Sequence, residues 1–287
     1  MDQVSLNHVS MLPALKTKFS LRAAPSSFAV FVGIFAAFFA AGVSAQSTFI
    51  SFTGATYTQN FNTLPSSGTF PFSGSGPFDL PTTTPGSLNG WGFGRLAGSS
   101  PNASFLFDDG TNTTASAYSY GSTGATERAL GSISTGSTLN TAFGALLVNN
   151  SGATINSITL TFTGEQWHRG GNSQSLDFGY GVGATSVLAG TFTPFSALNF
   201  GNVQNGSSAP LDGNLPANQL LISATITGLN WTNGSNLVIR WTNTGNAAQP
   251  AGLAIDNFSF AIPEPGTVAL MAFGLGLLGL GIRRRLA

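Results

Sequence analysis

The segment Gly164–Arg169, with the sequence GEQWHR, holds the densest group of chemically reactive side chains in the chain. In an extended strand Glu165 and Trp167 point to the same side, because successive side chains alternate between the two faces. A carboxylate beside an aromatic ring can contact a sugar, whose CH groups stack on the ring. We therefore treat Glu165, Trp167 and Arg169 as candidate ligand contacts.

The same segment has a structural interpretation, in which Glu165 pairs with an arginine and Trp167 belongs to the core. Arg128 and Arg240 are the available partners. Glu127 and Arg128 cannot pair with each other in an extended strand, since adjacent residues point to opposite faces. A cross-strand pair of Glu165 with Arg128 is the arrangement that this interpretation favours.

Glycoside hydrolysis is the enzymatic chemistry that these residue types would support. It needs two carboxyl groups about 5–10 Å apart, and nothing in the sequence brings together any two of the four candidates, Glu127, Glu165, Asp177 and Asp256. A Ser-His-Asp triad would have to use His168, and the G-x-S-x-G motif is absent. We predict a non-enzymatic protein, with an extracellular glycan hydrolase as the alternative.

Metal sites built from cysteine or from several histidines are excluded, because the chain has no cysteine and His168 is the only histidine after His8. The turns Asp108–Asn112 and Asp212–Asn214, and the Asp256-Asn257 pair, offer oxygen ligands for Ca²⁺. Neither turn matches an EF-hand loop, and Asp-Gly is also common in plain turns. We expect no cofactor and no metal site, with a structural Ca²⁺ as the alternative.

The charge distribution excludes nucleic-acid binding through phosphate neutralisation. Only 7% of the 287 residues are charged, and between residues 46 and 262 four arginines and eight acidic residues give a net charge of −4. A basic patch, which phosphate contacts require, is not visible.

An all-β fold is predicted for residues 46–261. Apolar side chains alternate with hydroxyl or other polar ones in INSITLTFTG, SLDFGYG, LLISATITGL and NLVIRWTN, which indicates antiparallel strands with one buried face. Further strands are predicted at Phe49–Thr53, Ser104–Asp108, Ala117–Tyr120, Arg128–Ile133, Ala142–Asn149, Ser186–Phe192 and Leu253–Phe260. No amphipathic helix separates them, which favours a two-sheet antiparallel β-sandwich of jelly-roll type.

One segment of the body is predicted to lack strands. Thr63–Gly90 contains five prolines and many Gly and Ser residues, as a long surface loop would. Phe70, Phe72 and Phe78 are expected to anchor this loop to the body.

Residues 1–45 are predicted to be a secretory signal peptide that passes through the Sec translocon. Basic residues precede the apolar run Phe28–Ala41, which is expected to be helical, and small residues follow it. Cleavage is expected between Ala45 and Gln46. A start at Met11 instead of Met1 would give a basic segment of more usual length.

Residues 262–287 combine a proline turn, a short apolar segment and a basic end. As a helix, Thr267–Ile282 would be about 24 Å long, which is short for a hydrocarbon core of about 30 Å. The prolines keep this helix from continuing into the body, and Arg283–Arg285 would stay on the cytoplasmic side. We expect a short transmembrane helix that tethers the exported body transiently.

This order of elements resembles the PEP-CTERM sorting signal of Gram-negative bacteria. The residues that carry the resemblance are Pro263, Glu264, Pro265, Arg283, Arg284 and Arg285. It implies processing near Pro-Glu-Pro by an exosortase, a membrane transpeptidase-like enzyme, and export toward the cell surface or an exopolysaccharide matrix. An ordinary tail anchor is the alternative.

The body also resembles bacterial secreted β-sandwich modules that often carry this tail. FNTLP, YSYGSTGATERALGSI, ITLTFTGEQWHRG and GLAIDNFSF carry this resemblance, which implies an architecture and no particular activity. We therefore predict an exported module at the cell surface or in the extracellular matrix, which binds polysaccharide or surface partners or has a purely structural role.

Overall fold

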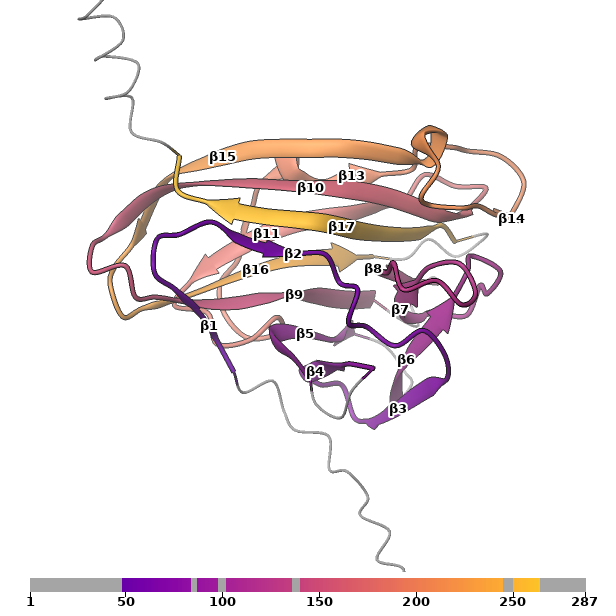
Figure 1. Ribbon diagram of the computed structural model, residues 1–287, viewed down its shortest axis with the longest axis horizontal. Helices are drawn as coiled ribbons and strands as arrows, with labels where there is room; N and C mark the ends of the chain where they lie inside the picture. Colours follow the sequence, from indigo (N-terminus) through magenta and orange to yellow (C-terminus); the bar gives the residue numbers. More distant parts are fainter. Residues whose placement is uncertain (1–47, 84–86, 98–101, 136–139, 245–249, 264–287) are drawn as a thin grey trace, which may run out of the picture. The chain divides into compact units, whose positions relative to one another are not determined.

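The computed structural model describes residues 48–83, 87–97, 102–135, 140–244 and 250–263. These residues form an all-β fold of two sheets with two short 3-10 helices, Ser196–Leu198 and Pro216–Asn218 (Figure 1). The predicted signal helix, the cleavage position at Ala45 and Gln46, and the tail from Glu264 onward lie outside these ranges. Within them, no helix has the length and apolar character needed to cross a membrane.

The first sheet has eight strands. They are β1 (Ile50–Phe52), β4 (Phe78–Pro81), β5 (Ser87–Ala97), β9 (Asn140–Asn149), β11 (Ser175–Val182), β12 (Thr193–Pro194), β13 (Phe200–Gly201) and β16 (Asn236–Asn243). Their order is β12-β11-β16-β9-β5-β4, with β1 beside β9 and β13 beside β11.

The second sheet has nine strands. They are β2 (Tyr57–Gln59), β3 (Thr69–Ser73), β6 (Asn102–Asp108), β7 (Ser116–Tyr120), β8 (Ala129–Ile133), β10 (Ile155–Arg169), β14 (Ala209–Pro210), β15 (Gln219–Trp231) and β17 (Gly252–Ala261). Their order is β14-β10-β17-β8-β7-β6-β3, with β15 beside β10 and β2 beside β17.

The alternation of side chains along β10 decides which face of the second sheet is buried. Ile158, Leu160 and Phe162 are fully buried. On the opposite face the hydroxyl of Thr161 lies 2.7 Å from that of Ser223 on β15. This arrangement confirms the predicted strand, because apolar groups leave water while cross-strand hydroxyl pairs remain exposed.

The core lies between the two sheets and is rich in aromatic residues. At its centre Trp241 of β16 is fully buried. Its ring contacts Phe162 and Phe258 of the second sheet at centroid distances of 5.2 and 6.0 Å, and Phe178 of its own sheet at 5.2 Å. Edge-to-face contacts of this kind add to the hydrophobic gain from burial. The two sheets therefore share one core.

The sheets are mixed, and not purely antiparallel as predicted. β1 pairs with β9 and β6 pairs with β7 in parallel orientation. Parallel neighbours usually need a long crossover. The β6–β7 ladder has only four residue pairs, a length of about 10 Å, which the short segment 109–115 can span.

Two of the predicted local structures were wrong. The expected loop Thr63–Gly90 contains β3, β4 and the start of β5, although Phe72 and Phe78 do anchor it through stacked rings 4.8 Å apart. The expected strand Ser186–Phe192 is irregular. Its Val187 instead packs with Leu146 and Val238 on the outer side of the first sheet, and this packing explains the apolar pattern.

We expect Gly144→Ala to destabilise the protein by about 1–3 kcal/mol, as overpacking does. A Cβ at Gly144 of β9 would overlap the carbonyl oxygen of Ile239 and lie 2.7 Å from the Cα of Arg240, both in the backbone of β16. The matched control is Gly179→Ala in β11, where the nearest atom would be 3.5 Å away. Urea denaturation of both variants checks this. Equal loss of stability would contradict the close approach of β9 and β16.

Candidate functional site

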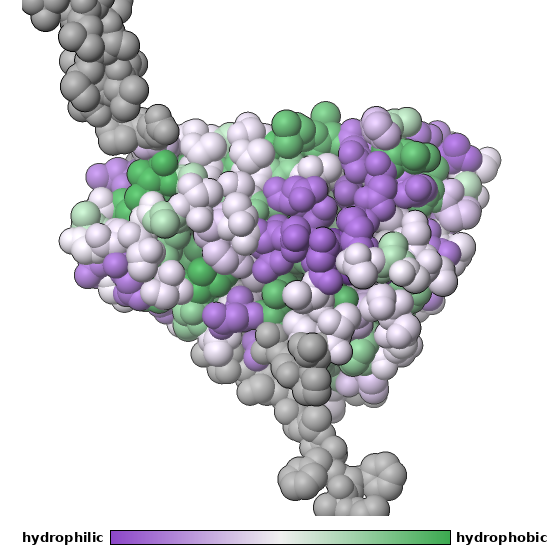
Figure 2. All heavy atoms as spheres, in the orientation of Figure 1, coloured by the Kyte–Doolittle hydropathy of each residue, from purple (hydrophilic) through white to green (hydrophobic). Residues whose placement is uncertain are grey.

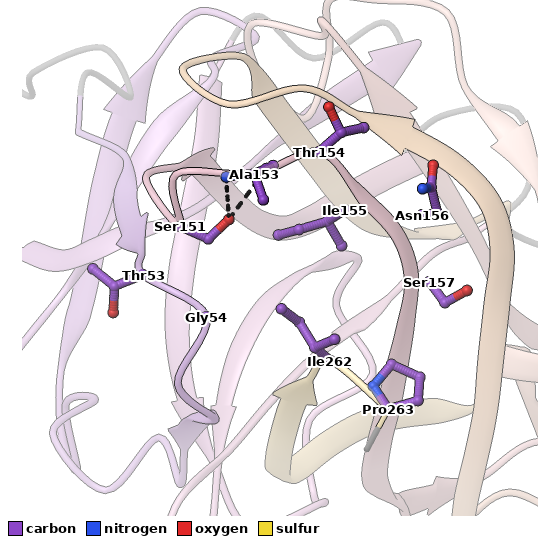
Figure 3. A pocket seen from close by; sticks show the side chains of 10 residues that line it. All are labelled: Thr53, Gly54, Ser151, Ala153, Thr154, Ile155, Asn156, Ser157, Ile262 and Pro263. Atoms are coloured by element: carbon purple, nitrogen blue, oxygen red, sulfur yellow. Dashed lines mark hydrogen bonds between the residues drawn. The ribbon is translucent and has the colours of Figure 1, made fainter. Parts of the chain in front are cut away.

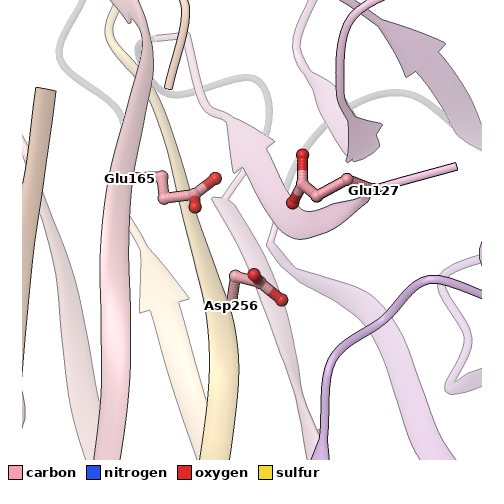
Figure 4. Close-up of side chains that lie close together, drawn as sticks. All are labelled: Glu127, Glu165 and Asp256. Carbon is pink, nitrogen blue, oxygen red and sulfur yellow. The ribbon is translucent and has the colours of Figure 1, made fainter. Parts of the chain in front are cut away.

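Three carboxylates from distant parts of the sequence meet at the second sheet. Glu165 lies on β10, Asp256 on β17, and Glu127 two residues before the start of β8. Their positions follow from the register, because β17 lies between β10 and β8 and pairs with both. One carboxylate oxygen from each residue lies within 4.8 Å of the other two, and Figure 4 shows the three side chains converging. We call Glu127, Glu165 and Asp256 the acidic cluster.

The hydrogen bonds to the acidic cluster are few. The indole Nε1 of Trp167 donates to Glu165 Oε2 at 2.9 Å, and Gln219 Nε2 donates to Glu165 Oε1 at 3.4 Å. Asn214 Nδ2 donates to Glu127 Oε2 at 2.7 Å. Glu127 Oε1 and Asp256 Oδ1 are buried and have no hydrogen-bond partner. The cluster therefore keeps unused acceptor capacity, which is costly away from water.

Burial dominates the electrostatics of the acidic cluster. Glu165 is 1% and Asp256 3% exposed. Desolvation, reinforced by the negative charge of Asp256, raises the pKa of Glu165 to about 9. Desolvation, opposed by a hydrogen bond from the backbone N–H of Asn257 and reinforced by Glu127, raises the pKa of Asp256 to about 7. Both carboxyl groups thus favour the protonated form unless a cation compensates their charge.

The predicted ion pair between Glu165 and Arg128 is wrong. Nη2 of Arg128 donates to the carbonyl oxygens of Ser122 and Ala125, at 2.8 and 2.9 Å, and its guanidinium lies 5.0 Å from the ring centroid of Phe107. Glu127 takes the position facing Glu165, and its neighbour Arg128, which precedes β8, is held by the loop carbonyls instead.

Arg240, the other predicted partner, is also engaged elsewhere. It donates to the carbonyl oxygen of Val187 at 2.8 Å and stacks over Phe192 at 3.5 Å. In the part of the chain that the structure describes, no ion pair is formed by any member of the acidic cluster.

Trp167 and Arg169 do not form one surface with Glu165. The ring of Trp167 is 1% exposed, stacks on Tyr120 at 5.7 Å and is covered by Gly213, where a Cβ would overlap the indole. Arg169 Nε donates to the carbonyl oxygen of Ser207. Glu165 and Trp167 share a strand face as predicted, but that face is closed by the turn around Gly213.

The two Asp-Gly turns use their carboxylates locally. Asp108 Oδ1 accepts from the backbone N–H of Gly110 at 2.7 Å and of Asn112 at 3.0 Å. Asp212 Oδ1 accepts from the N–H of Asn214 at 3.0 Å. These contacts are those of ordinary Asx turns. The third predicted calcium candidate, Asp256, belongs to the acidic cluster instead.

His168 links two loops. Its Nδ1 lies 2.7 Å from the carbonyl oxygen of Gly110, so this nitrogen is the donor, and Nε2 lies 2.8 Å from the hydroxyl of Ser208. A Ser-His hydrogen bond is one element of a nucleophilic site. Here a backbone carbonyl stands where a triad has a carboxylate, so the pair does not complete the triad considered from the sequence.

Shallow depressions mark the surface of the described residues, and three of them have no member of the acidic cluster in their linings. One of about 460 Å³ has Ile155, Ile262 and Pro263 in its wall (Figure 3). A second, of about 370 Å³, is lined by Thr58, Gln59, Asn60, Asn257, Phe258 and Ser259. A third, of about 410 Å³, is lined by Asp109, Thr111, Asp212 and the predicted contact residue Trp167.

The second depression has a polar lining, which we call the amide face and define by Thr58, Gln59, Asn60, Asn257 and Ser259. These residues belong to β2 and β17 or directly follow β2. Figure 2 shows hydrophilic residues gathered on the side of the molecule that carries these strands. Neutral amide and hydroxyl groups make up most of this surface, which suits hydrogen bonding to uncharged polar ligands.

Comparison with known proteins identifies the tail. Residues 261–285 match the PEP-CTERM protein-sorting motif. This match confirms the sorting signal predicted from Pro263, Glu264, Pro265 and the three terminal arginines. No curated protein matches the chain.

Several solved structures are distantly similar to the chain. The K3 cleaved adhesin domain of Lys-gingipain from Porphyromonas gingivalis W83 is 13% identical over 71% of this chain and 98% of that one, with a TM-score of 0.33. The CBM22-1 xylan-binding domain of Paenibacillus barcinonensis Xyn10C is 8% identical over 76% and 99%, with a TM-score of 0.33.

The enzymatically active domain of bacteriophage CBA120 tailspike protein 4 is 8% identical over 60% of this chain, with a TM-score of 0.33. The chain spans only 19% of that protein's length. Similarities at this level of identity and TM-score carry no functional argument.

Proposed function

We propose that this chain is an exported bacterial protein that an exosortase sorts through its PEP-CTERM tail. The observation that carries the proposal is the motif match at residues 261–285. After tethering through the tail, the body is displayed at the cell surface or in the extracellular matrix. It serves there as a non-enzymatic module that binds polysaccharide or has a structural role.

The junction between body and tail supports this proposal. β17 pairs with β2, β8 and β10 and ends at Ala261. The Pro-Glu-Pro motif begins at Pro263, whose missing N–H and fixed φ do not favour continuing the ladder. Processing near this motif would therefore leave every strand pair of the body intact.

For the body we propose a jelly-roll-like sandwich that displays the amide face to polysaccharide. Thr58 and Asn60 are exposed there. Their hydroxyl and amide groups can exchange hydrogen bonds with the hydroxyls of a polymer. The amide face replaces Glu165 and Trp167 as the candidate ligand contact, because both of those side chains are 1% exposed.

The alternative, an extracellular glycan hydrolase, is less well supported. Its two carboxyl groups should lie about 5–5.5 Å apart in a retaining enzyme and farther apart in an inverting one. The oxygens of the acidic cluster lie within 4.8 Å of one another. Glu165 and Asp256 are also too deeply buried to reach a glycosidic bond.

The sorting proposal predicts an exosortase-dependent C-terminus. In the native bacterium, mass spectrometry should find the mature protein ending near Pro263–Pro265, and the strain without its exosortase should retain the tail. Replacing Pro263, Glu264 and Pro265 together by alanine should reproduce the deletion phenotype. A tail that ends at Ala287 in both strains would show that the body is held by an ordinary anchor instead.

The binding proposal predicts that the amide face retains the protein on the exopolysaccharide of its own bacterium. The double variant Thr58→Ala/Asn60→Ala should weaken co-sedimentation by about tenfold, as the loss of two hydrogen bonds would. Asn156→Ala, at another exposed asparagine, is the matched control and should bind normally. If wild-type protein and double variant sediment equally, the amide face is not the binding surface.

A further inference from the structure

The acidic cluster has more negative charge than its surroundings compensate. Three carboxylates approach within 4.8 Å, and no ion pair reaches them from the residues that the structure describes. Asp212 adds a further negative charge near Glu165. Like charges at such distances in a buried place repel strongly, so the group needs either protons or a bound cation.

A second observation points to a cation. Asp256 is 3% exposed, its Oδ1 has no hydrogen-bond partner, and one of its carboxylate oxygens lies within 4.8 Å of those of Glu127 and Glu165. Glu127 Oε1, on the other side of the cluster, is also buried and without a partner. Buried oxygens that no protein donor satisfies are acceptors for a hard cation.

We propose that the acidic cluster binds one divalent cation, Ca²⁺, through Glu127, Glu165 and Asp256. Ligands on opposite sides of Ca²⁺ lie about 4.6–5.2 Å apart, whereas ligands across the smaller Mg²⁺ lie about 4.0–4.2 Å apart. The three carboxylate oxygens lie within 4.8 Å of one another, a limit that leaves room for Ca²⁺ between them. The site is distinct from the two Asp-Gly turns, whose carboxylates accept backbone N–H groups.

Such an ion would join parts of the chain that are far apart in sequence. It would link β10 and β17 to the segment before β8. Because Asn214 donates to Glu127 Oε2, the ion would also be connected to the turn that covers Trp167. Glu127 is the only partly exposed member of the cluster. By joining these segments the ion would stabilise the outer face of the second sheet. None of them belongs to the tail, so this effect does not depend on how the tail is processed.

Calcium titration of the mature protein, purified from its bacterium and stripped with EDTA, tests the proposal. Calorimetry should give one Ca²⁺ per chain, and saturating Ca²⁺ should raise Tm by about 5 °C. MgCl₂ at equal ionic strength should raise Tm less. No binding, or an equal effect of both salts, would overturn the assignment.

Variants locate the ion. Glu165→Gln and Asp256→Asn keep the side-chain shape and remove one charge each, so they should fold and lose the calcium-induced rise in Tm. Asp109→Asn, at a partly exposed aspartate of an Asp-Gly turn, is the control and should keep the full rise. Loss of the rise in Asp109→Asn, with retention in the other two, would place the ion in that turn and overturn the proposal.

Luminescence of Tb³⁺, a probe for calcium sites, gives an independent measure. The Trp167 indole is hydrogen-bonded to Glu165, so excitation of tryptophan should sensitise Tb³⁺ bound at the cluster, and Ca²⁺ should displace it. Trp167→Phe should remove most of the sensitised emission while calcium still raises Tm. Undiminished emission in Trp167→Phe would show that the lanthanide binds elsewhere.

Discussion

In EDTA, the stability of the protein is expected to fall as the pH rises from 5 to 8. The pKa of Glu165 rises from 4.5 to about 9 on folding, chiefly through desolvation. Between these values the folded state holds a proton that the unfolded state has lost, so the free energy of unfolding decreases with pH. At about 1.4 kcal/mol per pH unit for one proton, we expect a loss of about 2–4 kcal/mol, or about 5–10 °C in Tm.

Three of the groups that face Glu165 raise its pKa, and one lowers it. The negative charges of Asp256, Glu127 and Asp212 raise its pKa, and the hydrogen bond from Trp167 lowers it. Asp256 contributes to the same fall in stability, because its pKa rises from 3.8 to about 7. Arg128 donates to the Ser122 and Ala125 carbonyls and forms no ion pair with Glu165, and its charge acts on the neighbouring Glu127.

Glu165→Gln is the variant that isolates this effect. It should melt close to wild type at pH 5, where Glu165 is protonated, and several degrees higher than wild type at pH 8 in EDTA, because the amide carries no charge to bury. Asp109→Asn is the matched control and should melt in parallel with wild type throughout. Melting curves at both pH values check this. A wild-type protein that becomes more stable toward pH 8 would contradict the buried, uncompensated cluster.

Trp241→Ala is expected to cause a similarly large loss, about 3–5 kcal/mol, because a truncated buried tryptophan leaves a cavity. Trp241 is fully buried and its ring touches aromatic side chains of both sheets. Trp241→Phe should lose clearly less, since a ring still fills part of the space. Urea denaturation measures the difference.

Leu221→Ala is the control for this variant. Leu221 is 71% exposed on β15, so its truncation should change the free energy of unfolding by less than about 0.5 kcal/mol. If Trp241→Ala were tolerated as well as Leu221→Ala, the two sheets would not share the core seen in the structure.

The strands that were predicted correctly are those whose pattern is local. Ile158, Leu160 and Phe162 alternate with threonines, and this period of two is enough to indicate both the strand and its buried face. β3 and β4 were missed, because Pro71 and Pro77 lie in or beside them and the surrounding glycines are typical of loops. The opposite error was made at Ser186–Phe192, where a strand was predicted. Val187 is buried there although the segment is irregular, and such burial produces an apolar pattern without a strand.

The acidic cluster could be predicted only in part. The sequence singled out Glu165 and placed it on one face with Trp167, and it named Glu127 and Asp256 as available carboxylates. It could not place them together, because their proximity depends on β17 lying between β10 and β8. Strand order and register are properties of non-local pairing, and no local pattern in a single sequence encodes them.

The sequence by itself determined the sorting signal and the all-β class of this protein. A sorting enzyme reads a contiguous tail, so the order of Pro263–Pro265, an apolar segment and Arg283–Arg285 is sufficient, and strand formation follows from neighbouring residues. Only the tertiary structure decided that Glu165 meets two carboxylates and no arginine. Charge balance at a buried site depends on which chain segments become neighbours in space, and that is settled by the packing of the whole fold.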